Sequence, residues 1–144
     1  MDYPPIVVEV TYSAFAEKVW KAITERDQMV QWFFDNIPDF KAEVGFRTEF
    51  PVVAPSQTFI HIWTVTEVVP NKKLTYKWNF GGFKSDAFTT FELTEEGTQT
   101  TLKLTAVGGE GFLKEKNIPE FERESGVGGW NYFLGESLKK YLAK

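Results

Sequence analysis

Residues 74–80 read Leu-Thr-Tyr-Lys-Trp-Asn-Phe, and this short stretch decides the fold class. Large apolar side chains occupy every second position, and polar side chains occupy the positions between them. Because successive side chains of a strand point to opposite faces, this period of two predicts a β-strand with one buried and one solvated face. The same alternation marks residues 46–50, 89–93 and 101–105. Short connections separate these segments, so we expect an antiparallel meander.

One longer strand is predicted over residues 58–69, and its inward face is ambiguous. His61 and Trp63 belong to one set of alternate positions, whereas Ile60 and Ile62 belong to the other. Both sets contain apolar residues, so the pattern does not select between them. A β-bulge would let each set face the core along part of the strand.

The N-terminal part of the chain predicts a strand followed by a helix. Residues 6–12 are rich in β-branched side chains, which favours a strand. Phe15, Val19 and Ile23 then recur at a spacing of four, which indicates an amphipathic helix of about three turns. Ser13 is the expected N-cap of this helix, because its hydroxyl can accept a backbone N–H.

Two further helices complete the pattern. A short helix is predicted over residues 28–34, with Asp27 as its cap. The chain ends with a long amphipathic helix, in which Gly135 indicates a close contact or a small gap. The apolar stripe of this helix follows i, i+3, i+4 spacing and consists of Trp130, Phe133, Leu134, Ser137, Leu138, Tyr141 and Leu142. Residues 108–129 are Gly-rich, charged and aperiodic, and we expect a long loop that is either a lid or docking element or a solvated connector.

The order of these elements defines an α+β fold. We expect one strand, two short helices, about six antiparallel strands in a curved sheet, and a long C-terminal helix around which the sheet wraps. The length of 144 residues predicts one domain over residues 1–144.

The composition excludes several functional classes. The chain has no cysteine and one histidine, so we expect no disulfide, no thiolate nucleophile, no metal site and no cofactor. A net charge of −4 without a basic run argues against nucleic acid as a partner. No apolar stretch reaches the length of a membrane span, and the first residues lack the pattern of a signal peptide. We therefore expect a cytoplasmic protein, and the sequence leaves its oligomeric state open.

No catalytic residue is predicted. The acidic residues of the middle of the chain are scattered singly, without the spacing of an acid–base pair, at Asp35, Asp39, Glu43, Glu49, Glu67, Asp86 and Glu92. We expect most of them to be solvated. If His61 points inward, it is either a polar contact for a ligand or a pH-sensitive group. The commoner alternative is an ordinary hydrogen-bonded or surface histidine.

Aromatic residues are the unusual feature of the composition, at 17% of the chain. Many of them fall on the predicted inner faces, where they either fill a packed core or line a pocket for a flat or apolar molecule. A sticky outer surface is the least favoured alternative. The candidate cavity-lining residues are Trp32, Phe46, Phe50, Trp63, Tyr76, Trp78, Phe91, Trp130, Phe133 and Leu134.

Several segments, in order along the chain, resemble one known family. They are residues 17–24 with Trp32 and Phe33, residues 44–47, residues 65–70 with 74–78, residues 97–98 with Leu102 and Leu104, and residues 129–130 with Leu134, Leu138 and 141–142. Together they resemble the domain of activator of heat-shock protein 90 ATPase homologues, within the START-like (SRPBCC) group of helix-grip folds. This family often has glycine where the present chain has Trp63, so the resemblance implies an additional large ring.

The resemblance has three functional implications. Helix-grip folds commonly enclose a cavity, which implies binding of an apolar or aromatic small molecule, such as a lipid or a polycyclic compound, between the sheet and the C-terminal helix. The family name implies the alternative of a stress-response co-chaperone that binds heat-shock protein 90. Larger family members add an N-terminal domain, so we expect a lone domain to lack most of that apparatus. A third implication is a cyclase-like enzyme that works through the shape of its pocket.

Overall fold

Six antiparallel strands form one curved sheet in the computed structural model, which describes residues 5–55, 57–82, 87–108 and 123–143. The order across the sheet is β1-β6-β5-β4-β3-β2, so the chain forms a meander and its first strand pairs with its last. The strands are β1 (Ile6–Tyr12), β2 (Arg47–Val53), β3 (Thr58–Val69), β4 (Lys73–Phe80), β5 (Ala87–Glu96) and β6 (Gln99–Val107). The predicted α+β class is confirmed.

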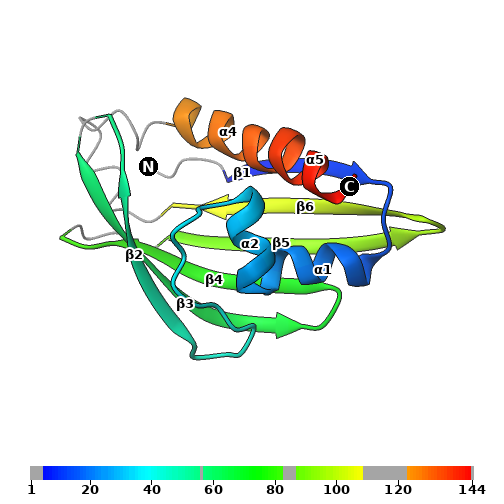
Figure 1. Cartoon of the computed structure of the whole chain (residues 1–144), viewed down its shortest axis with the longest axis horizontal. Coiled ribbons are helices and arrows are strands. Elements are labelled where there is room, and N and C mark those ends of the chain that lie inside the picture. The colour runs from blue at the N-terminus through cyan, green and yellow to red at the C-terminus, as the bar shows by residue number, and fades with distance from the viewer. Residues whose placement is uncertain (1–4, 56, 83–86, 109–122, 144) are drawn as a thin grey trace.

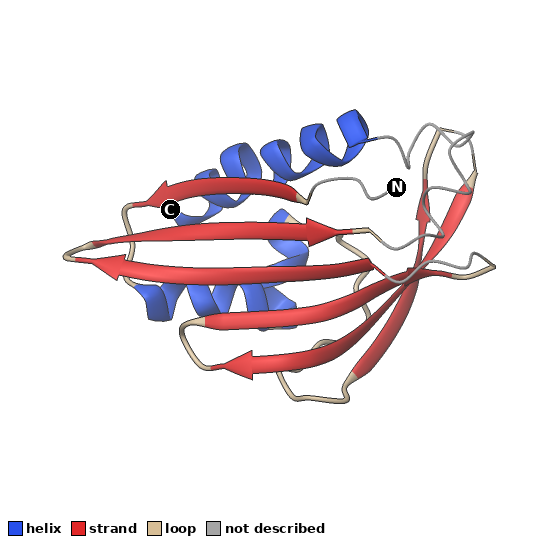
Figure 2. Cartoon of the chain, turned by 180° about the vertical axis from the view of Figure 1, so that it is seen from behind, coloured by secondary structure: helices blue, strands red, loops and turns tan. Residues whose placement is uncertain are grey.

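The helices lie on one face of this sheet. Figure 1 shows them in front of the strands, and Figure 2 shows the opposite face without helices. The helical segments are α1 (Ala16–Thr24), α2 (Arg26–Trp32), α4 (Arg123–Tyr132), the π-helix η2 (Phe133–Leu138) and α5 (Lys139–Leu142). The last three form one continuous C-terminal helix across the sheet. Each strand therefore has one covered and one solvated face, which explains its period of two.

The structure resolves the ambiguity of β3. Phe59, His61, Trp63 and Val65 are buried, so this set of alternate positions faces the core. The pairing of β3 with β4 shifts between Val65 and Glu67, which confirms the predicted bulge.

The beginning of α1 differs from the prediction. Phe15 occupies the N-cap position, is 57% exposed, and makes no side-chain cap hydrogen bond. Ser13 is therefore not the cap. The backbone N–H of Ala16 instead donates to the Glu95 carboxylate, at 2.8 Å, from the end of β5. A long-range contact replaces the local cap, which no sequence pattern around the helix predicts.

The bounds of the other helices also differ. Helix α2 begins at Arg26 with Glu25 as its N-cap, so Asp27 lies inside the first turn and is not the cap. Helix α4 begins at Arg123, so the end of the predicted loop 108–129 is helical. Its other residues, except Gly108, lie outside the described part of the chain.

The C-terminal helix contains the π-helical segment η2, which the sequence pattern does not predict. The Tyr12 hydroxyl donates to the Leu134 carbonyl at 2.7 Å, and the Ser137 hydroxyl donates to the Trp32 carbonyl at 2.6 Å. These hydrogen bonds connect η2 to β1 and to the end of α2. A Cβ added to Gly135 would meet no atom within 4 Å, which agrees with a gap and excludes a close contact.

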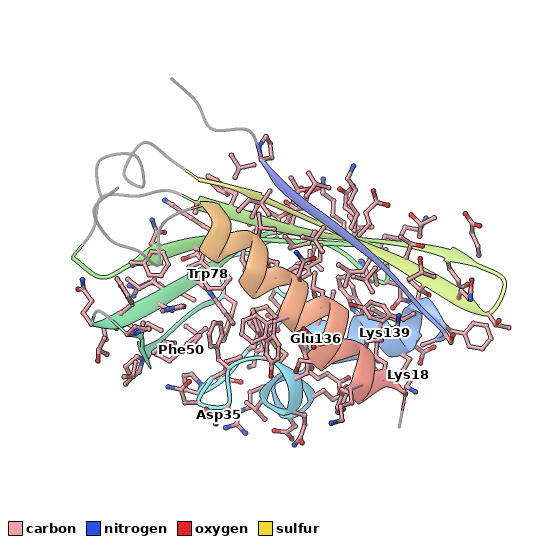
Figure 3. The ribbon with its side chains drawn as sticks, turned by 90° about the horizontal axis from the view of Figure 1, so that it is seen from above. Lys18, Asp35, Phe50, Trp78, Glu136 and Lys139 are labelled. Carbon is pink, nitrogen blue, oxygen red and sulfur yellow. The ribbon has the colours of Figure 1, made fainter. Side chains whose placement is uncertain are left out.

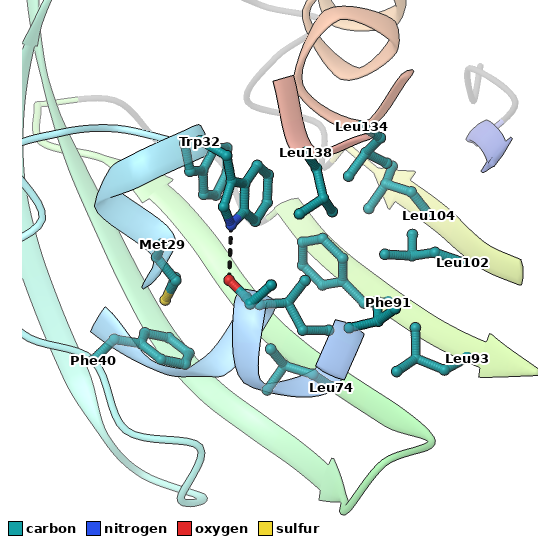
Figure 4. Packing of buried hydrophobic residues seen from close by; sticks show 14 of the residues in the cluster. Met29, Trp32, Phe40, Leu74, Phe91, Leu93, Leu102, Leu104, Leu134 and Leu138 are labelled. Carbon is teal, nitrogen blue, oxygen red and sulfur yellow. Dashed lines mark hydrogen bonds between the residues drawn. The ribbon is translucent and has the colours of Figure 1, made fainter. Parts of the chain in front are cut away.

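The buried face of this helix packs into a single hydrophobic cluster with the sheet and the short helices. Leu134, Leu138 and Leu142 are buried along it, as the apolar stripe predicts. Figure 4 shows Leu134 and Leu138 facing the leucines of β6 and Phe91 of β5. The aromatic residues continue this cluster toward the other end of the sheet.

Candidate ligand-binding site

All ten predicted cavity-lining residues lie in this hydrophobic cluster or pack against it. Seven are buried, namely Trp32, Phe50, Trp63, Tyr76, Phe91, Trp130 and Leu134, whereas Phe46, Trp78 and Phe133 are half-buried. Their rings form a continuous network through pairs such as Trp63–Tyr76, with ring centroids 4.8 Å apart, and Tyr76–Phe91, 5.8 Å apart. The sticky outer surface is therefore the wrong interpretation of these ten residues.

Phe33 lies at the centre of the network, although the sequence interpretation did not include it among the candidates. Its ring centroid is 4.8 Å from those of Trp32 and Phe133 and 5.5 Å from that of Trp63. Phe33 follows the last residue of α2 and has non-helical dihedral angles, φ −107° and ψ −135°. The chain has left helical geometry at this residue, and the Phe33 ring still lies stacked on that of Trp32, with an interplanar angle of 6°.

Phe34 was missed for the same reason. Its ring centroid is 5.6 Å from that of Phe50, 5.2 Å from that of His61 and 5.3 Å from that of Phe133. The run of three aromatic residues at 32–34 was the available signal, because a helix of any length would expose one of them.

We define the aromatic end of the molecule as Phe34, Phe50, His61, Trp78 and Phe133. Phe50 pairs with His61 across β2 and β3, and His61 contacts Trp78 with ring centroids 5.4 Å apart. Phe34, Trp78 and Phe133 are half-buried, so this end of the core keeps apolar surface in contact with solvent. Figure 3 shows Phe50 and Trp78 at one end of the molecule, with Lys18 and Lys139 at the other.

Three buried ring nitrogens in or next to the aromatic end have no hydrogen-bond partner among the described residues. They are Nδ1 of His61, Nε1 of Trp63 and Nε1 of Trp78. Trp63 and Trp78 are direct cross-strand partners with ring centroids 5.2 Å apart, and His61 lies two residues before Trp63 on the same face. Trp32 provides a contrast, because its Nε1–H donates to the Ala22 carbonyl at 2.8 Å (Figure 4).

His61 is neutral in this environment. Burial lowers the pKa of its imidazole from 6.5 to about 4, because the apolar surroundings disfavour the charged form. The rings in contact with it include Phe34, Phe50, Trp78 and Phe80. His61 is therefore an inward polar group, and the interpretation as a surface histidine is wrong.

The scattered acidic residues are solvated as expected. The exposed ones are Asp35, Asp39, Glu43, Glu49, Glu67 and Glu92, whereas Asp86 lies outside the described residues. Within the described ranges, no group of three or more histidine, cysteine or acidic side chains is placed to hold a metal ion. In the same ranges, no helix has the length and apolarity needed to span a membrane.

Comparisons with solved structures agree with this architecture. The chain is similar to protein MLL2253 from Mesorhizobium loti, with 31% identity, a TM-score of 0.74 and 96% of each chain covered. It is also similar to Aha1 from Colwellia psychrerythraea, solved as a dimer, with 22% identity, a TM-score of 0.72, and 97% of this chain and 96% of that one covered. DynU16, from the dynemicin biosynthetic locus, has 24% identity and a TM-score of 0.78, and the match covers 99% of this chain and 48% of that one. The last two likenesses support the fold alone.

The comparison with protein families identifies the chain more closely. No curated protein matches its sequence. The family model described as "Activator of Hsp90 ATPase homolog 1-like protein" matches residues 13–143, from the end of β1 to the end of the C-terminal helix. The predicted resemblance is thus confirmed over nearly the whole chain. The chain belongs to the activator of Hsp90 ATPase homolog 1-like protein family.

Proposed function

We propose that this protein binds an apolar or aromatic small molecule at its aromatic end, between the sheet and the C-terminal helix. The observation that carries the proposal is the half-buried state of the three neighbouring rings Phe34, Trp78 and Phe133 beside the buried cluster. Apolar rings that stay partly solvated beside a buried cluster gain free energy when another apolar surface covers them. The helix-grip resemblance favours the same location.

The geometry suits a flat ligand. Phe133 lies nearly perpendicular to Phe33, with an interplanar angle of 84°, and Trp78 lies at 79° to Phe34. A planar molecule in contact with such rings meets both ring edges and ring faces, which are the favourable aromatic arrangements. We place Trp63, Phe50, Phe46 and Trp32 behind these rings as the support of the site.

A ligand screen tests this proposal. We expect members of a panel of polycyclic aromatic compounds, flavonoids and lipids to raise the melting temperature and to shift the NMR signals of the aromatic end. Phe133→Ala removes a half-buried ring of the site, and we expect roughly 10-fold weaker binding. Phe15→Ala is the matched control, because Phe15 is exposed in front of α1, and we expect its affinity within about twofold of the wild type. No melting or NMR response across the panel would refute the proposal.

The co-chaperone function is the alternative, and the family description is what favours it. A pulldown with a heat-shock protein 90 chaperone and an assay of its ATPase activity would test it. Stimulation that survives Phe133→Ala would assign the chaperone function to a different surface. No association at micromolar concentrations would count against it.

A further inference from the structure

The C-terminal helix is anchored to the rest of the molecule over its second half. Figure 1 shows α4 and α5 at the two ends of this helix. The leucines of residues 134–142 are buried, and three side-chain hydrogen bonds also hold this part in place. They join Tyr12 to the Leu134 carbonyl, Ser137 to the Trp32 carbonyl and Lys18 to the Leu142 carbonyl, at 2.7, 2.6 and 2.9 Å.

Helix α4, which precedes this anchored part, is held much less firmly. Among residues 127–132, whose side chains the structure describes, only Trp130 is buried. Tyr132 is 54% exposed, and Asn131 is exposed as well. No side chain of residues 127–132 forms a hydrogen bond within the described part of the chain. A segment with so few buried contacts opens more readily than the core of the fold.

The residues of α4 also weaken it as a helix. Gly126, Gly128 and Gly129 all lie within residues 126–129. Glycine loses more backbone freedom than alanine when it enters a helix, so each glycine raises the equilibrium constant for opening roughly 4-fold. Close packing often explains a helical glycine, but a Cβ added to Gly128 or Gly129 would meet no atom within 4 Å. These two glycines therefore destabilise α4 without any packing reason.

The π-helix η2 separates the weak part of the helix from the anchored part. Successive turns of a regular α-helix stabilise one another, whereas a π-segment changes the pattern of hydrogen bonds, and long helices kink at such segments. The segment η2 begins at Phe133, one residue before the carbonyl that Tyr12 binds. Opening that begins at the glycines therefore ends at this junction, and α5 stays packed.

We propose that α4 is the gate of the aromatic end, and that it unwinds locally as far as η2 while residues 134–142 stay in place. The ring that moves with it is Trp130, whose centroid lies 5.8 Å from those of Trp78 and Phe91. Opening uncovers these rings on β4 and β5 and gives an apolar molecule a path to them. The role in ligand entry rests on the proposed function, whereas the opening itself is a property of the free protein.

Hydrogen exchange of the ligand-free protein, measured by NMR for each amide and corrected for intrinsic rates, tests the local opening. We expect the amides of residues 129–132 to exchange roughly 10-fold faster than those of residues 138–141. The double variant Gly128→Ala/Gly129→Ala should slow the exchange of residues 129–132 roughly 15-fold. Gly135→Ala is the matched control, because its added methyl group also meets no atom within 4 Å but lies beyond the junction. It should leave the exchange of residues 129–132 within about twofold of the wild type.

Stopped-flow fluorescence with N-phenyl-1-naphthylamine, an uncharged apolar dye, tests the role of the gate in ligand entry. A molecule that enters and leaves through the open gate does so at rates proportional to the open fraction. We therefore expect the double variant to slow both association and dissociation roughly 15-fold, with the affinity within about twofold of the wild type. Gly135→Ala should change neither rate.

The two measurements separate the gate from the proposed function. Equal protection along the whole helix, or equal slowing of exchange by Gly135→Ala, would overturn the local opening. Unchanged dye association in a double variant whose amide exchange has slowed would overturn the role in entry. No binding of the dye, together with no response to the wider ligand panel, would refute the proposed function and with it the role in entry, while the exchange rates still decide whether α4 opens.

Discussion

His61 gives the protein a dependence of stability on pH that can be assigned to one residue. It is the only histidine of the chain, and burial among aromatic rings lowers its pKa from 6.5 to about 4. In the unfolded chain the imidazole is solvated and takes up a proton near its ordinary pKa. Between these two values the unfolded state binds more protons than the folded state, so stability falls as the pH falls.

The two pKa values set the size of the effect. At about pH 5 the unfolded histidine is almost fully protonated and the folded one is almost fully neutral. The linkage relation then gives a loss of about 2 kcal/mol relative to about pH 8, with a limit of about 3 kcal/mol below about pH 4. For a domain of this size, about 2 kcal/mol lowers the melting temperature by roughly 4–8 °C.

Urea unfolding of the wild type and of His61→Phe, at about pH 8 and about pH 5, measures this contribution. Phe keeps a ring at the position and cannot titrate, so other groups contribute equally to both proteins. We expect the free energy of unfolding of the wild type to fall by about 2 kcal/mol more than that of the variant. A parallel fall in both proteins, or an NMR titration of His61 with a pKa near 6.5, would refute the reasoning.

Three further predictions concern the framework of the site. Tyr12→Phe removes the hydroxyl that donates to the Leu134 carbonyl, and should lower the free energy of unfolding in denaturant by about 1–3 kcal/mol. Tyr132→Phe, at an exposed ring, should change it by less than about 0.5 kcal/mol. Equal effects of the two variants would contradict the role of this hydrogen bond. Glu95→Ala removes the long-range cap of α1 and should lower stability by about 1 kcal/mol; no loss in thermal or denaturant unfolding would show that the cap contributes nothing. Gly135→Ala should raise the free energy of unfolding by about 0.5–1 kcal/mol, because there is room for the added methyl group. Gly97→Ala should lower it by about 1 kcal/mol, because φ is +62° at this position. A loss of stability in Gly135→Ala would mean that the space is occupied.

The strands and the last helix were predictable because their signals are local. Leu74, Tyr76 and Trp78 alternate with polar residues, and the structure places all three on the covered face of β4. The stripe through Leu134 and Leu138 likewise predicts the buried side of the C-terminal helix. One face of each element is buried, and the apolar residues of that face recur in the sequence with the period of a strand or a helix.

Other features were not predictable, because they depend on residues distant in the sequence. The Glu95 carboxylate caps α1 by accepting the N–H of Ala16, and the Tyr12 hydroxyl donates to the Leu134 carbonyl of η2. The rings of Phe33 and Phe34 both turn inward because the chain leaves helical geometry at the end of α2. Helical spacing alone does not predict this change, and the run of three aromatic residues at 32–34 is its one local signal.

The sequence by itself determined the α+β class, the meander, the buried stripe of the last helix and the aromatic character of the interior. The tertiary structure alone decided which face of β3 turns inward, and so placed His61 and Trp63 beside Trp78. The physical reason is that alternation specifies two faces, while packing against partners from β2, β4 and α2 selects the one that leaves water. That selection brings together three buried ring nitrogens from two strands.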